Sequence, residues 1–303
     1  MEILTRILGI ILPVFIIIGL GYAYARARGD TVRTDMLSAN RISMDVLMPL
    51  LIFTALAAKD FDVAHNATLI AAGVLISLGS GLLGWPVARL FGYEVRSFVP
   101  PMMYNNCGNM GLPLAVLAFG AQELGAAVAL FMACNLVYFT AGVKILESGR
   151  GGPRVSFWQF LRNPVMIAMA LGMLFAIAHV TVPTPVFAAM KILGDACIPL
   201  MLFSLGVRMC DISLRSWSIG MIGAIVCPLS GLIVAALLDV LLNLTPVQRG
   251  QMYLFASLPP AVTCFMMAEQ YKQEPDKVAS IVLLGNLVSF VFVPIGLWLG
   301  LPK

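Results

Sequence analysis

Eight consecutive residues at positions 106 to 113, Asn-Cys-Gly-Asn-Met-Gly-Leu-Pro, interrupt a stretch that is otherwise apolar enough for a membrane-spanning helix. Asparagine side chains donate and accept hydrogen bonds, whereas glycine and proline disfavour a continuous helix. Backbone that leaves the helical conformation at bilayer depth is tolerated only where it is buried in protein or lines a cavity. The run therefore predicts a broken helix that forms a solute-binding site, as in a transporter.

A second group of polar and proline residues lies near the end of the chain, where Ser257, Pro259, Pro260 and Thr263 interrupt another apolar stretch. Each proline removes a backbone donor and clashes with the preceding helical turn, yet proline is favoured at the first position of a helix. We therefore expect Pro113, and Pro259 or Pro260, to restart a half-helix after an unwound segment. A kink between packed helices would explain an isolated proline, but not the grouping in both stretches.

The chemistry that such a pair of breaks offers is electrostatic. The start of a half-helix presents unpaired N–H groups and about half a positive charge, which suits a carboxylate. Residues 97–122 and 250–268 contain no charged side chain, so an anion would be held by dipoles and amides and could still be released. The candidate substrate-binding residues in the two stretches are Asn105, Asn106, Asn109, Gly111, Pro113, Ser257, Pro259, Pro260 and Thr263.

Two further asparagines, Asn135 and Asn286, lie in the apolar stretches that directly follow the two breaks. Asparagine in a membrane helix commonly bonds across to a neighbouring helix. Either residue could line the substrate site or hold the crossing backbone in shape, and both readings remain open.

Three carboxylates within apolar stretches are candidates for gating or coupling. Asp45 and Asp195 each follow a cation by four residues (Arg41 and Lys191), which permits an ion pair on one helix face. Both lie near expected helix ends, which favours a structural or gating role, with proton coupling as the minority hypothesis. Glu269 is expected at the interface, where it could add polarity to a vestibule.

The composition sets the class of protein. The chain has 303 residues, of which 60% are hydrophobic and 11% are charged, as in a polytopic helical membrane protein. The net charge of +4 sits in short loops and does not indicate a nucleic-acid partner. The six cysteines form no CxxC or CxxH pair, so neither a metal site nor a disulfide framework is expected. No catalytic or nucleotide-binding motif is present, so we expect no enzyme activity and no cofactor.

Ten apolar segments are each long enough to cross a bilayer as a helix. The first could be mistaken for a signal peptide, but its apolar run is long enough to span and has a counterpart later in the chain. The segments are 4–25, 36–58, 66–91, 98–120, 122–146, 157–180, 187–208, 216–242, 249–271 and 276–300.

The second half of the chain repeats the first. Arg41, Asp45, Pro49, Phe53 and Thr54 correspond to residues of the same kind 150 positions later, and Asn135-Leu136-Val137 recurs 151 positions later as Asn286-Leu287-Val288. The sequence therefore predicts two five-helix repeats, residues 1–148 and 157–303, joined by a cytoplasmic loop at 149–156. An odd number of spans gives the two repeats opposite orientations, which is a common architecture of secondary transporters. The expected fold is thus an all-α polytopic membrane protein with two inverted repeats, in which broken helices 4 and 9 cross.

The distribution of basic residues predicts the orientation. Of the 19 Lys and Arg residues, 14 fall at the connections 1–2, 3–4, 5–6, 7–8 and 9–10, and 5 fall on the opposite side. Basic residues accumulate in cytoplasmic loops. Both termini are therefore expected outside the cell.

The run Asn106 to Pro113, the proline-bearing ninth span and the ten spans in two inverted fives resemble the auxin efflux carrier family. The resemblance covers the whole chain, and the Asn106 to Pro113 motif is its most specific part. Short-looped prokaryotic members of that family include malonate and other organic-acid transporters. The overall architecture is also similar to that of the bile acid:sodium symporter superfamily.

The resemblance implies a scaffold of helices 1, 2, 6 and 7 that mediates a homodimer, and a mobile transport domain of helices 3–5 and 8–10. It implies a multi-pass protein of the bacterial inner membrane, with periplasmic termini, that moves a small organic anion by an elevator-like mechanism. It assigns functional roles to Asn106, Pro113 and Pro259, and substrate contact to Asn135. The adjacent prolines Pro259 and Pro260 depart from the family pattern and leave the restart point of the second half-helix open.

Two alternatives remain at this stage. A sodium-coupled symporter of the bile-acid type would need several oxygen ligands near the crossing, and Asn105, Asn109, Thr263 and Glu269 form only a thin set. A membrane sensor that uses a transporter fold would bind a ligand without carrying it across, and the absence of any appended soluble domain in this sequence disfavours it.

Overall fold

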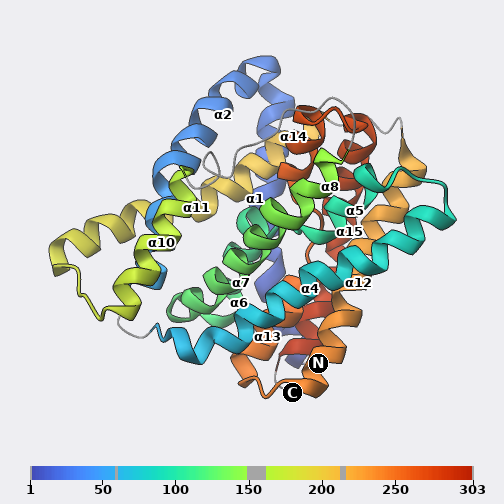
Figure 1. Cartoon of the computed structure of the whole chain (residues 1–303). Coiled ribbons are helices and arrows are strands. Elements are labelled where there is room, and N and C mark those ends of the chain that lie inside the picture. Colours follow the sequence, from blue (N-terminus) through green and yellow to red (C-terminus); the bar gives the residue numbers. More distant parts are fainter. Residues whose placement is uncertain (1, 59–60, 149–161, 212–215, 302–303) are drawn as a thin grey trace.

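The computed structural model describes residues 2–58, 61–148, 162–211 and 216–301 (Figure 1). Within them every regular element is a helix, and extended backbone pairs at one isolated position, Asn105 with Pro260. The all-α prediction is confirmed for these residues. The predicted junction at 149–156 lies outside them.

Within the described part of the chain, seven helices are long and apolar enough to cross a membrane, and each coincides with one of the ten predicted spans. Their ranges are Thr5–Arg28, Thr34–Leu56, Val63–Leu90, Ala121–Glu147, Thr184–Arg208, Trp217–Leu241 and Pro275–Gly300. The other three predicted spans contain shorter helices. Two of them, 98–120 and 249–271, are divided by the breaks, and the described part of 157–180 forms α10 (Pro164–Ile177).

The first half of the chain begins with α1 (Glu2–Arg28), and the second predicted span comprises three pieces. These are α2 (Asp30–Ile42), a π-helical turn η1 (Ser43–Leu47) and α3 (Met48–Leu56). The next helix, α4 (Val63–Leu90), starts at Asp62, whose carboxylate accepts from the backbone N–H groups of Ala64 at 2.8 Å and His65 at 3.2 Å. This cap satisfies two donors that the first helical turn leaves unpaired.

The remaining elements of the first half are α5, the π turn η2, α6, η3, α7, the π turn η4 and α8. Their bounds are Val95–Met103, Cys107–Gly111, Leu112–Phe119, Ala121–Glu123, Leu124–Val137, Tyr138–Gly142 and Val143–Glu147.

The second half contains α10, α11 (Thr184–Arg208), η5 (Met209–Asp211) and α12 (Trp217–Leu241), followed by α13 (Pro246–Ala256), α14 (Val262–Gln270) and α15 (Pro275–Gly300). The start of α13 is a capping box, in which the Thr245 hydroxyl and the Gln248 side chain each bond the backbone of the other residue. The cap fixes where α13 begins, and the helix runs for 11 residues to its end at Ala256.

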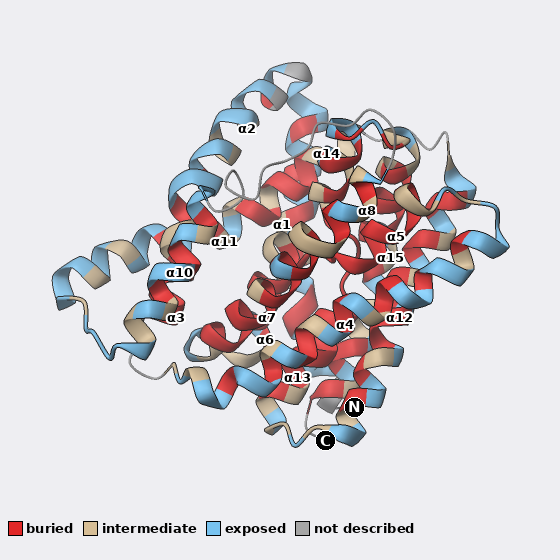
Figure 2. Cartoon of the chain, in the orientation of Figure 1, coloured by how far each residue is buried: buried red, intermediate tan, exposed pale blue. Residues whose placement is uncertain are grey.

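The helices pack in two sets. In one, α1 lies along α11, and α3 packs against both α10 and α11; in the other, α12 packs against α15 and α4, while α4 also contacts α5 and α7. α2 and the first part of α11 are largely exposed and α10 is mixed, whereas α5, α6 and α7 are mostly buried (Figure 2). The core around the breaks therefore belongs to the second set.

The α1–α11 pair is unusually close because glycines face the partner backbone. A Cβ added at Gly21 would overlap the carbonyl oxygen of Phe203, and one added at Gly206 would overlap that of Ile18. Small residues allow this approach, and close packing is a principal source of helix association in lipid.

The outward surface of the long helices is apolar. Leu82 of α4, Ile192 of α11 and Val240 of α12 are 73%, 72% and 86% exposed, and α1 presents a row of exposed aliphatic side chains. An aqueous surface rarely carries so many, whereas hydrocarbon solvates them without cost. The surface therefore agrees with the composition in requiring a lipid environment.

Candidate functional site

Both predicted breaks are present. Helix α5 ends at Met103, residues 104–106 are not helical, and helical backbone resumes at Cys107. Likewise α13 ends at Ala256, residues 257–261 are not helical, and α14 begins at Val262. α13 and α14 thus extend toward opposite ends of the molecule in Figure 1. The sequence located both interruptions correctly.

The two breaks cross and pair with each other. Asn105 and Pro260 form an antiparallel bridge. The backbone N–H of Asn106 donates to the carbonyl of Pro259 at 2.6 Å, and that of Ala261 donates to the carbonyl of Tyr104 at 3.0 Å. Each unwound segment thereby satisfies polar backbone groups of the other, which is the condition for leaving the helix inside a membrane.

The restart points differ from the prediction. Helical backbone in the first half resumes at Cys107 as a π turn, six residues before Pro113, which lies in the first turn of α6. In the second half, α14 starts only after both Pro259 and Pro260, so neither restarts the helix. A residue that precedes proline is pushed out of the α region, so the double proline keeps this backbone extended until Ala261. The prolines thus supply carbonyl acceptors to the crossing instead of initiating a helix.

Four buried polar side chains secure the crossing in two equivalent pairs. The Asn106 Nδ2 donates to Asn286 Oδ1 at 3.0 Å, and the Tyr104 hydroxyl donates to Asn135 Oδ1 at 2.9 Å. Asn286 Nδ2 donates to the Val282 carbonyl and Asn135 Nδ2 to the Phe131 carbonyl, both at 2.7 Å and both four residues back. Asn286 Nδ2 also lies 3.4 Å from the Pro260 carbonyl. Of the two readings for Asn135 and Asn286, this geometry favours the one in which they hold the crossing backbone.

The polar groups that could still bind a ligand lie at the starts of the two half-helices. Among the described residues, no oxygen atom accepts from the backbone N–H groups of Gly108, Asn109, Val262 or Thr263. The side chains of Asn109 and Thr263 likewise have no hydrogen-bond partner within the described ranges, and all four residues are half-buried. Two helix N-termini with uncommitted donors on either side of one crossing form the arrangement that suits an anion.

Three other candidate residues of the two stretches pack against the protein or bond to it. A Cβ on Gly111 would lie 2.8 Å from Leu258 and 3.3 Å from Phe255, so this glycine allows the two broken helices to approach. Ser257 Oγ donates to the Leu254 carbonyl at 2.7 Å. Asn105 Nδ2 donates to the Phe255 carbonyl, at the last turn of α13. Neither of these two side chains is directed by its bonding to the uncommitted donors.

The carboxylates proposed for gating are exposed. Lys191 and Asp195 form the expected ion pair at 3.0 Å. Arg41 and Asp45 form none among the described residues, and the π turn η1 begins between them. Glu269 is exposed near the end of α14.

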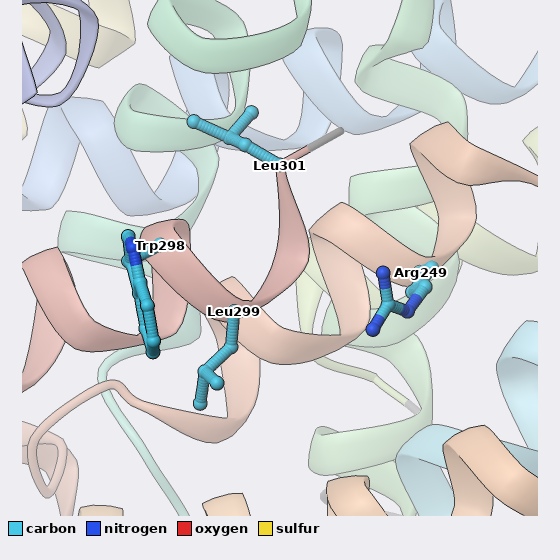
Figure 3. Close-up of a pocket in the computed structure, with 4 residues that line it drawn as sticks. All are labelled: Arg249, Trp298, Leu299 and Leu301. Atoms are coloured by element: carbon cyan, nitrogen blue, oxygen red, sulfur yellow. The ribbon is translucent and has the colours of Figure 1, made fainter. Parts of the chain in front are cut away.

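A network that the sequence did not single out joins the ends of α12 and α13. Arg249 Nε lies 2.8 and 2.9 Å from the two carboxylate oxygens of Asp239, and the Tyr253 hydroxyl donates to that carboxylate at 3.1 Å. Arg249 also lines a cavity of about 360 Å³ with Trp298, Leu299 and Leu301 (Figure 3). At 1.5 Å per helical residue, Arg249 lies roughly 10 Å along α13 from the crossing. Nothing in the spacing of Asp239 and Arg249 marks them as partners.

Long apolar helices with an apolar outer surface, two of them interrupted and paired, define a polytopic helical membrane protein of the kind that carries solutes. Comparison with known families specifies this further: the model of the family described as membrane transport protein matches residues 6–156 and 153–297. The chain belongs to this family, that of the auxin efflux carriers, as its motifs suggested.

Individual relatives match over nearly their full length. An "Uncharacterized transporter" of Methanothermobacter thermautotrophicus is 25% identical, with 94% of this chain and 95% of the relative covered. A "Putative malonate transporter" of Rhizobium meliloti is also 25% identical, with 96% and 94% covered. A second "Uncharacterized transporter", from Methanocaldococcus jannaschii, is 22% identical, with 96% and 97% covered.

Proposed function

We propose that this protein is a secondary transporter of a small organic anion, which binds between the half-helix N-termini of η2 and α14. The observation that carries the proposal is the set of uncommitted donors at Gly108, Asn109, Val262 and Thr263. One carboxylate can accept from N–H groups on both sides of the crossing, where the two dipoles add. The name of the Rhizobium meliloti relative makes malonate the first substrate to test.

The site suits transport better than permanent binding. No residue in 97–122 or 250–268 carries a charge, so the anion meets dipoles rather than a fixed countercharge. The paired asparagines beside the crossing are buried and already bonded to protein, so they need not exchange partners when the anion leaves. Moderate affinity at a rigid site permits both loading and release.

The mechanism that we propose is elevator-like alternating access. In it, the ten spans form two inverted five-helix repeats; α1, α2–α3, α10 and α11 form a scaffold, and the remaining helices form a moving body that carries the crossing. The helix packing described above supports this division, because α1, α3, α10 and α11 pack mainly with one another. Gly108 lies against Met48 of α3 and Met201 of α11, so the proposed site faces the scaffold.

The assembly and location that we propose follow from the same division. The exposed apolar faces of α10 and α11 suit a homodimer formed through the scaffold or contact with the lipid bilayer. The excess of basic residues at the connections supports our proposal that both termini lie on the periplasmic side of a bacterial inner membrane.

The test is uptake of labelled malonate and other dicarboxylates by the purified protein in proteoliposomes. Thr263→Ala and Asn109→Ala should each lower uptake several-fold without a change in melting temperature, because neither side chain bonds to the described protein. Ser257→Ala is the matched control, since its hydroxyl bonds only the Leu254 carbonyl. Tight binding of malonate with no uptake in any gradient would refute transport and favour a sensor. Uptake that persists when choline replaces sodium would separate the proposal from sodium symport.

A further inference from the structure

The side-chain carboxamide of Asn105 has a hydrogen-bond partner for its nitrogen but none for its oxygen among the described residues. Its side chain is 91% buried, as it is 9% exposed. Nδ2 donates to the Phe255 carbonyl, whereas Oδ1 is buried without a hydrogen-bond partner among the described residues. A buried acceptor left unpaired is costly, and most such atoms in proteins have a partner in protein or ordered water.

Asn105 borders a small cavity. This cavity lies between α4, α5, α12 and the end of α13, and the room inside it for a guest's centre, about 10 Å³, is close to what one water molecule needs. Its lining includes Asn105, Ser77, Ser80, Cys227 and Gly231. It is on the α12 side of the crossing, whereas Gly108 faces α3 and α11. The cavity is therefore separate from the proposed anion site.

The polar side chains that line the cavity determine which hydrogen bonds a molecule bound there must form. Ser80 is 3% exposed, and its hydroxyl forms no hydrogen bond with the described residues. Ser77 Oγ donates to Cys134 Sγ at 3.6 Å, which leaves its oxygen free to accept. The Cys227 thiol is directed to the carbonyls of Pro101 and Leu258. A guest must therefore donate to Asn105 and can exchange bonds with both serines.

We propose that this cavity binds a single water molecule, which donates to Asn105 Oδ1 and bonds the hydroxyls of Ser77 and Ser80. Water fits in size, and the site supplies the three polar partners that a buried water typically has. A metal cation fits less well, because all the lining side chains are neutral and only three of them offer oxygen ligands.

The bound water has a structural consequence for the crossing. With Oδ1 held by the water, the Asn105 carboxamide keeps Nδ2 on the Phe255 carbonyl, in the last turn of α13. The backbone of the same residue pairs with Pro260. The water thus links α4 to the residue that joins both broken helices, independently of the proposed transport function.

The direct test is a high-resolution map of the full protein in lipid, with Ser80→Val and Ser80→Ala as variants. The wild type should show one density peak within hydrogen-bond distance of Asn105 Oδ1 and Ser80 Oγ. Ser80→Val fills the space and should remove the peak, and Ser80→Ala leaves the space open and should retain a weaker one. Melting temperature should fall by several degrees in Ser80→Val and by less in Ser80→Ala.

Two results would overturn the proposal. An empty cavity in a wild-type map that resolves other buried waters would show that Asn105 is left unpaired. A wild-type melting temperature that rises with sodium but not with choline, together with density ringed by additional carbonyl oxygens, would identify a cation instead. An unchanged melting temperature in sodium and choline, with the peak present, supports water.

Discussion

The two unwound segments perform the same backbone task with different residues. Residues 104–106 are Tyr-Asn-Asn and lead into a π turn, whereas 257–261 are Ser-Leu-Pro-Pro-Ala and lead directly into α14. The first segment provides side-chain donors to Asn135 and Asn286, and the second provides mainly carbonyls and a helix N-terminus. Backbone pairing across the crossing is thus symmetric, and side-chain polarity is concentrated in the first half.

The two segments therefore keep their unwound conformation in different ways. The prolines keep the second segment extended by restricting their own backbone and that of the residue before each of them. The asparagines and the tyrosine of the first segment are held by specific buried partners, so their replacement should be costly. Substitutions at the two segments should therefore separate effects on the fold from effects on the anion.

The largest effect is expected from a negative charge at the second N-terminus. Thr263→Asp should lower anion uptake by roughly tenfold or more, since like charges a few ångströms apart repel by several kcal/mol at an intermediate dielectric. The same carboxylate lies in the first turn of α14 and favours the helix dipole, so stability should not fall. Thr263→Asn is the neutral control of similar size, and uptake and melting temperature are the measurements. Equal uptake by the two variants would remove α14 from the anion site.

The next effect concerns the first segment. Asn106→Ala removes the donor to Asn286 Oδ1, which is buried. An orphaned buried acceptor costs about 1–3 kcal/mol, so both the free energy of unfolding and uptake should fall. The double variant Asn106→Ala with Asn286→Leu removes both partners, and recovery of part of the stability, measured by thermal unfolding, would identify the hydrogen bond as the cause. A single variant as stable as the wild type would contradict the bonding described here.

Tyr104→Phe tests the equivalent bond of the other pair. The change removes only the hydroxyl that donates to Asn135 Oδ1 and keeps the ring, which stacks on Tyr138 at 4.4 Å between centroids. We expect a loss of about 1 kcal/mol in the free energy of unfolding, at the lower end for a buried pair because the stacking remains. Asn135→Ala should cost more, since it also removes the bond to Phe131. A Tyr104→Phe loss larger than that of Asn106→Ala would reverse the ranking of the two pairs.

Much of this arrangement could be predicted from sequence because it depends on local chemistry. Proline, glycine and asparagine marked the first break, and proline with serine and threonine marked the second. Seven of the predicted spans coincide with long apolar helices. The restart points could not be predicted, because Pro259 and Pro260 act through carbonyls that bond the other segment. Their roles depend on the crossing and not on helix preference.

The roles of individual polar residues were harder to assign for the same reason. Asn105 and Asn106 are adjacent and identical in type, yet one side chain points to the end of α13 and the other to Asn286. Tyr104 carried no signal beyond its position before the asparagines. Asp239 and Arg249 are ten residues apart across a helix end, a spacing that no helical periodicity connects.

The smallest effect is expected far from either segment, at the exposed ion pair of α11. Lys191 and Asp195 lie 3.0 Å apart, with side chains 46% and 50% exposed. Exposed pairs four residues apart on a helix contribute about 0.3–0.5 kcal/mol in water, and the cation-first order is the weaker one. Lys191→Ala should therefore leave melting temperature and uptake nearly unchanged, with Asp195→Asn as the matched variant. If instead both variants altered the pH dependence of uptake, the carboxylate would take part in coupling, and the separation between the crossing and the outer helices would be wrong.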